Sequence, residues 1–227
     1  PIASASDLEG STIQLRANVA SGGFENLSAT YTIQNSDLNS NKVISTNAST
    51  FEALSSGLSH GESIVFTAII TDKAGNASTG TNSTTSITFD ETATTITGVA
   101  ATTSNGSYKA GDVIAITVGF SEVVYITGAP QLTLNTGGSY AVVNYSSGSG
   151  SNTLTFNYTI GSGETSGDLD YVATSSLSLN SGTIRDAASN NATLTLASPG
   201  ATNSLGSNKA LIIDTTLPTV AGVTATT

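Results

Sequence analysis

One phrase of sequence occurs twice in this chain. Residues 88–103 read TFDETATTITGVAATT and residues 212–227 read IIDTTLPTVAGVTATT, so that Asp90 matches Asp214. A long-period repeat of this kind is the signature of tandem modules, each of which is one structural unit of a longer array. The repeat predicts a first, shorter domain at residues 1–90, a longer domain at 91–214, and the start of a further linker or repeat at 215–227.

Both predicted domains consist of short runs in which apolar and polar residues alternate. Residues 11–19, for example, place Ile13, Leu15 and Ala17 on one face. Val, Ile, Thr and Tyr fill the runs, whereas Gly, Asn, Ser and Asp fill the gaps, and every candidate helix is broken by Gly or Ser. The pattern predicts an all-β chain of two tandem Ig-like antiparallel β-sandwiches with Greek-key connections. The other alternating runs are residues 29–33, 64–70, 86–89, 113–120, 131–134, 140–145 and 153–160.

Composition narrows the classes of function. The net charge is −10 with only six Lys and Arg residues, so a nucleic-acid backbone would be repelled and is not expected as a partner. Cys is absent, which excludes disulfides and thiolate chemistry. No apolar run approaches the ~18 residues needed to span a bilayer, so we expect no membrane insertion by this segment. Met is also absent, and we expect the chain to be a piece of a longer polypeptide.

Several motifs of the chain are characteristic of a known group. The longer domain contains Asn105-Gly-Ser-Tyr-Lys-Ala-Gly-Asp-Val-Ile, Phe120-Ser-Glu-Val-Val, Pro130-Gln-Leu-Thr-Leu-Asn and Gly182-Thr-Ile-Arg-Asp-Ala-Ala-Ser-Asn-Asn, and the shorter domain contains Thr71-Asp-Lys-Ala-Gly-Asn. These motifs resemble tandem bacterial Ig-like repeats of very large secreted surface proteins, many of them adhesins. The resemblance implies an extracellular, monomeric extender segment that contacts neighbouring repeats, often with Ca²⁺ between them, while other domains bind a host-surface glycan or protein.

Chain order in an Ig-type sandwich also predicts a metal site. The linker carries Asp90, a loop after the second strand of the longer domain is expected to begin with Glu122, and the last loop begins with Asp186. Clustered carboxylates repel each other unless a cation neutralises them, and Ca²⁺ prefers six to eight oxygen ligands. With no Cys and no clustered His, Zn²⁺ and copper are disfavoured. We therefore expect Ca²⁺ on Asp90, Glu122 and Asp186, with Asp7, Glu9, Glu91 and Asn190 as further candidate ligands.

Catalysis is not expected. The single His of the chain, His60, lies in a turn between Ser59 and Gly61, and a catalytic triad would need a buried orienting carboxylate beside it. Trp is absent, so an aromatic platform for a sugar-cleaving site is missing. The alternative function is direct binding of a carbohydrate or protein by two inserted segments of the longer domain, residues 161–181 and 197–208.

Overall fold

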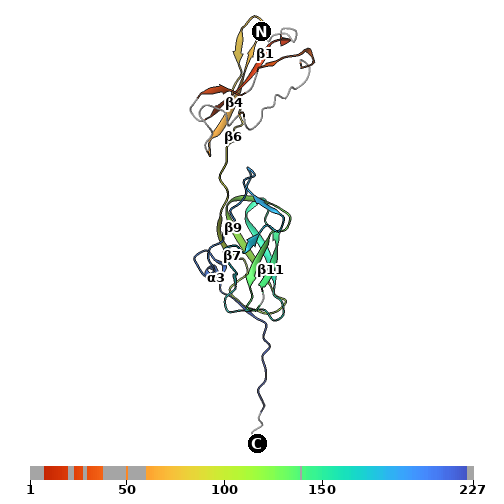
Figure 1. Ribbon diagram of the computed structural model, residues 1–227, viewed down its shortest axis with the longest axis vertical. Helices are drawn as coiled ribbons and strands as arrows, with labels where there is room; N and C mark the ends of the chain where they lie inside the picture. The colour runs from red at the N-terminus through yellow and green to blue at the C-terminus, as the bar shows by residue number, and fades with distance from the viewer. Residues whose placement is uncertain are drawn as a thin grey trace. The chain divides into compact units, whose positions relative to one another are not determined.

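Both halves of the chain are built of β-strands. The computed structural model describes residues 8–19, 23–27, 30–37, 50, 60–138 and 140–223. Contacts between Cα atoms divide the chain into two compact units, unit 1 (Pro1–Glu91) and unit 2 (Thr92–Thr227). Large antiparallel sheets make up each unit (Figure 1), which confirms the all-β prediction. That the units are Ig-like modules remains a prediction.

Unit 1 is organised around two long strands. β1 (Thr12–Val19) pairs antiparallel with β4 (Ser63–Thr71) along its whole length. Alternation along β1 turns Ala17 inward, where it packs with Leu27 and Ile64 beside the partly buried Leu15 and Phe66. The sheet is completed in the described part of the unit by β2 (Phe24–Asn26), β3 (Tyr31–Thr32), β5 (Ala77–Thr79) and β6 (Ile87–Thr88), and one 3₁₀ turn, η1 (Asn35–Asp37), follows β3.

Unit 2 contains a larger sheet with the strand order β14-β10-β11-β12-β9-β16, in which β7 also pairs with β9 and β15 with β10. A second sheet has the order β13-β17-β8, and its β17 and β8 run parallel. The strands are β7 (Ile96–Ala101), β8 (Gly106–Tyr108), β9 (Val113–Thr127), β10 (Gln131–Asn135), β11 (Tyr140–Ser147), β12 (Ser151–Thr159), β13 (Thr165–Ser166), β14 (Asp170–Tyr171), β15 (Leu177–Ser178), β16 (Thr183–Arg185) and β17 (Leu211–Asp214).

The core of unit 2 follows from strict alternation in β9 and β12. Ile114, Ile116, Val118 and Phe120 of β9 are buried, while the residues between them are partly exposed. Leu154, Phe156 and Tyr158 of the neighbouring β12 are buried on the same face. Burying a side chain of this size contributes about 1.5–3 kcal/mol, so the two strands supply much of the stability of the unit.

β9 is longer than the sequence predicts. We expected a loop to begin at Glu122, but the strand continues to Thr127. Gly119 lies opposite Thr153 and Val124 lies opposite Ser151, so residues 120–123 form a bulge that the partner strand does not match. Val124 returns to the core and is fully buried, which explains why the chain continues as a strand. The far half of β9 then pairs with β16.

The two inserted segments of unit 2 are part of its core. Residues 161–181 contribute the buried Leu169, Tyr171 and Leu177. Residues 197–208 end in a one-turn helix, α3 (Leu205–Asn208), which lies beside β7 (Figure 1) and buries Leu205 completely. The helix is capped by Ser204, whose side chain accepts a hydrogen bond from the Ser207 amide. Each segment is therefore anchored to the core by a few buried side chains, while most of its residues are exposed or partly buried.

Truncation of Leu205 should test how much the second inserted segment contributes. Leu205→Ala removes a completely buried side chain and should lower the free energy of unfolding of unit 2 by about 2–5 kcal/mol. Leu217, which is 82% exposed, provides the matched control, and Leu217→Ala should change stability by less than about 0.5 kcal/mol. Denaturant unfolding measures both variants. Equal effects of the two substitutions would show that α3 does not dock on the core.

Unit 2 should also lose stability at high pH because of Tyr171. Burial and, second, the Asp170 charge raise the pKa of Tyr171 to about 12, whereas an unfolded tyrosine ionises near pH ~10. The contribution of the protonated Tyr171 to the free energy of unfolding is therefore complete below about pH 10 and is lost as the pH rises towards 12. Burial and the neighbouring Glu164 also raise the pKa of Tyr158, which acts in the same direction.

Tyr171→Phe is the corresponding variant. It removes the 2.6 Å hydrogen bond to the Ala197 carbonyl oxygen, at a cost of about 1 kcal/mol near neutral pH. Between about pH 10 and 12 its stability should fall less steeply than that of the parent chain, since the raised pKa of Tyr171 no longer contributes. Denaturant unfolding across this range is the measurement, and parallel curves for the two proteins would contradict the assignment.

Candidate metal centre

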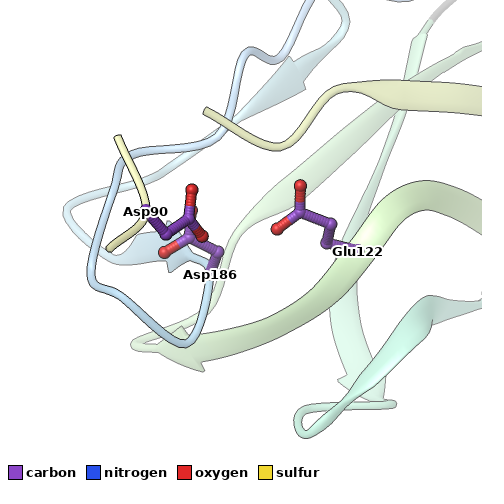
Figure 2. Close-up of side chains that lie close together, drawn as sticks. All are labelled: Asp90, Glu122 and Asp186. Atoms are coloured by element: carbon purple, nitrogen blue, oxygen red, sulfur yellow. The ribbon is translucent and has the colours of Figure 1, made fainter. Parts of the chain in front are cut away.

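Three carboxylates from three separate segments come together. Asp90 lies in the linker residues immediately before Thr92, Glu122 in the bulge of β9, and Asp186 directly after β16. One oxygen of each lies within 4.8 Å of the others. Figure 2 shows the three side chains and the separate segments that carry them. The group comprises the three residues that the sequence analysis placed first among the calcium ligands.

Asp186 is held by its own loop. The side chain is 3% exposed. One of its oxygens, Oδ1, accepts the Asn190 backbone amide at 2.9 Å, and the other, Oδ2, accepts the Asn190 side-chain amide at 3.0 Å. The Asp186 amide in turn donates to the Asn190 carbonyl oxygen at 3.1 Å. The loop thus fixes the carboxylate, and it places Asn190, another predicted ligand, directly beside it. Each carboxylate oxygen retains a further lone pair for a cation.

The same device occurs in unit 1 after β4. Both oxygens of Asp72 accept hydrogen bonds from Asn76, Oδ1 from the backbone amide and Oδ2 from the side chain, each at 2.8 Å. These hydrogen bonds, that of the side chain first, hold the pKa of Asp72 below its usual value. Asp72 and Asp186 each begin a five-residue loop that ends in Asn. An Asp in this position therefore has a structural role in its turn, whether or not an ion is bound.

Asp90 has a partner that the sequence analysis missed. The Nδ1 atom of His60 lies 2.9 Å from Oδ1 of Asp90. The sequence analysis placed His60 in a turn, and its side chain is 53% exposed. The pairing of β4 with β6 brings the two together, because the Gly61 amide donates to the carbonyl oxygen of Phe89, the residue before Asp90. Strand pairing across thirty residues leaves no local signal in the sequence.

The other predicted ligands lie outside the group of three carboxylates. Glu9 and Glu91 are exposed, and neither is a member of it. Asp7 falls outside the described residues. The structure thus brings together Asp90, Glu122 and Asp186, with Asn190 attached through Asp186.

Other acidic side chains of unit 2 bond within the fold. Asp112 forms an ion pair with Lys109 at 2.7 Å, and this bond is the main cause of its lowered pKa. Glu164 accepts hydrogen bonds from the Tyr158 hydroxyl and from the Gly161 amide, both at 2.6 Å. Asp170 accepts the Tyr171 and Gly200 amides. Each of these carboxylates thus has a donor of the chain beside it. Asp90 and Asp186 also have partners, His60 and Asn190, but they differ in lying close to each other and to Glu122, which places three carboxylates together.

The chemistry of the three carboxylates fits a hard cation. Two unit charges at 4.8 Å repel each other by about 1 kcal/mol in water and by about 3 kcal/mol at the effective dielectric constant of a protein surface. A divalent cation would convert this repulsion into attraction. All three side chains offer oxygen alone, which suits Ca²⁺ better than Zn²⁺ or copper. Protein carbonyl groups and water would complete the six to eight ligands that Ca²⁺ takes.

Comparison with protein-family models, with curated proteins and with solved structures gives no match to this chain. The resemblance to bacterial Ig-like repeats therefore remains a prediction from its motifs. Within the described residues, no helix has the length and apolar character that crossing a membrane requires.

The two Asp–Asn loops predict opposite effects of one exchange. Gly75 and Ser189 hold the same place in their loops, and both have a left-handed backbone, with φ of 91° and 75°. This conformation costs a residue with a Cβ atom about 1–2 kcal/mol, partly offset by the greater freedom of unfolded Gly. Ser189→Gly should therefore stabilise unit 2 by about 0.5–1 kcal/mol, and Gly75→Ser should destabilise unit 1 by a similar amount. Denaturant unfolding gives both values. Changes of the same sign would contradict the equivalence of the loops.

Proposed function

We propose that the chain is a non-enzymatic structural extender segment of a bacterial cell-surface adhesin, stiffened by Ca²⁺, that positions a distal binding domain. The observation that carries this proposal is the convergence of Asp90, Glu122 and Asp186, whose oxygens lie within 4.8 Å of one another. The sequence repeat and the motif resemblance support its tandem character. Its natural partners are then neighbouring repeats of the same polypeptide, outside the cell.

The three ligands have the properties that such a site requires. Asn190 orients Asp186, the bulge of β9 presents Glu122, and the turn at His60 contacts Asp90. The linker residue would thereby be tied to two separate elements of unit 2 by a single ion. Calcium sites of extracellular modules commonly have dissociation constants of ~10⁻⁴–10⁻³ M, so the linker would be restrained at extracellular calcium concentrations and would move when calcium is removed.

The inserted segments support an extender more than a direct binder. Residues 161–181 and 197–208 place Leu169, Tyr171, Leu177 and Leu205 in the core. Segments committed to packing are poorly suited to adapt to a ligand, because rearranging them would expose these side chains to water. The structural role is therefore the function that we propose for unit 2.

Calcium should stabilise the folded chain by mass action. At 10 mM CaCl₂, dissociation constants of the expected size correspond to about 1.4–2.7 kcal/mol of added stability for unit 2. Glu122→Gln removes one ligand charge without shortening the side chain and should abolish most of this gain. Asp168→Asn removes the same charge at an exposed carboxylate outside the group and should retain it.

Denaturant unfolding with calcium, or with sodium chloride of equal ionic strength plus chelator, measures these effects. X-ray scattering of the same samples should show that calcium narrows the range of conformations sampled by the parent chain and by Asp168→Asn, but not by Glu122→Gln. Identical stability and scattering with and without calcium would contradict the proposal. So would an equal loss of the calcium effect in both variants, because the effect would then be one of general charge.

A further inference from the structure

The segment that follows β17 is extended and has no strand partner within its described residues, 215–223. Its apolar side chains are unusually exposed for their type. Leu217 is 82% exposed, Val220 84% and Val223 91%. Within the described residues, these apolar side chains therefore lack the burial that a packed strand would give them.

The segment repeats the sequence of β7, the first strand of unit 2. Because Asp214 matches Asp90, Val220 takes the place of Ile96, and Val223 takes the place of Val99. In β7 these positions contact the core, with Val99 fully buried and Ile96 packed against it. The two valines of the segment thus have the side chains of a core strand but not its surroundings.

β7 occupies a slot with two walls. On one side it pairs with β9, with Gly98 opposite Gly119 and Val99 opposite Val118. On the other side lies the second inserted segment, where the Asn203 carbonyl oxygen accepts the Val99 amide at 2.9 Å and the Asn208 side chain donates to the Val99 carbonyl oxygen at 2.8 Å. A strand that enters this slot is held by backbone hydrogen bonds on both edges.

The slot leaves little room for a side chain at one position, and the repeated segment has a glycine there. A Cβ atom at Gly98 would lie 3.2 Å from Cβ and 3.3 Å from the carbonyl oxygen of Asn203. The equivalent residue is Gly222, although nothing within 4 Å of Gly222 requires a glycine there. The glycine therefore matches a wall that the segment itself does not contact in this structure.

The differences between the two strands are compatible with the same slot. Val220 is one methyl group smaller than Ile96, and Ala221 replaces Thr97, whose side chain is exposed. Pro218 replaces the buried Thr94. It lacks the hydroxyl that meets Ser121 but keeps a carbonyl oxygen, the group with which Thr94 accepts the Thr193 amide at 2.9 Å.

From these contacts we infer that residues 218–223 form a β7-type strand whose partner is the slot between β9 and the Asn203 loop of a unit-2-type module. Unit 2 of a second copy of this chain has such a slot. In the parent chain its own β7 fills the slot, because β7 belongs to the same chain and so competes at a high effective concentration. The neighbouring repeat of the proposed function would then be a module that carries the same inserted loop as unit 2. This inference rests on the tandem arrangement in the proposed function. It needs no cation, so all tests are done in chelator, where failure of calcium binding has no effect.

The first test places the strand of the segment in the slot. Ile96→Val with Thr97→Ala in the full chain gives residues 95–99 the sequence of residues 219–223. Because only one methyl group is removed from the core, the melting temperature of unit 2, followed by near-UV circular dichroism of its tyrosines, should stay within about 5 °C of the parent. A loss above about 10 °C, or loss of the cooperative transition, would overturn the inference.

The second test supplies the strand in trans. Gly98→Val forces a side chain against Asn203 and should weaken the docking of β7. A synthetic peptide of residues 214–227 should then bind the opened slot and raise the melting temperature of this variant with increasing peptide concentration. The matched control is the same peptide with the exchange Gly222→Val, which should have no effect.

Equal effects of the two peptides, or no effect of either, would overturn the inference. If Gly98→Val does not fold alone, the variant is refolded in the presence of each of the two peptides. Recovery of the tyrosine signal with the parent peptide alone supports the inference, and no recovery overturns it. The strand-exchange variant of the first test gives its result independently of Gly98→Val.

Discussion

The structure of unit 2 depends on the pairing of β9 with β12 and on the alternation of their side chains. Ile114, Ile116, Val118 and Phe120 pack on one face together with Leu154, Phe156 and Tyr158. The first half of β9 also carries β7, and the second half carries β16. The bulge between these halves is where the strand changes partners. Because all of these elements share one strand, its register decides which side chains can meet at its ends.

The acidic residues show how one side chain can serve both a fold and a site. Asp186 closes its loop through Asn190, as Asp72 does through Asn76. Of the two, Asp186 alone belongs to a group of three close carboxylates among the described residues. A turn that already fixes a carboxylate lowers the entropic cost of binding an ion there, because the ligand does not have to be ordered on binding. In our proposal Asp186 therefore has two roles. It closes its turn, as Asp72 does, and it binds calcium because two further carboxylates lie beside it.

Much of the architecture could be predicted because its signals are local. The alternating runs identified the main strands, and the gaps rich in Gly, Asn and Ser identified the turns. Asp90, Glu122 and Asp186 were grouped from chain order alone, and the structure places their oxygens together. The prediction was wrong about the element that carries Glu122, which is a bulged strand. The reason is that the strand continues beyond Glu122. Val124 is buried in the core, and β16, which comes from a distant part of the sequence, pairs with the end of β9.

The sequence by itself determined what depends on neighbouring residues: the period of two that makes strands, the Asp–Asn loops, and the repeat that relates residues 212–227 to residues 88–103. Only the tertiary structure decided what depends on register and packing. It paired His60 with Asp90, buried a few side chains of the inserted segments in the core, and packed Asn203 against Gly98. Local pattern specifies the conformation of a segment, but the partners of a side chain are set by strands and loops that come from distant parts of the chain.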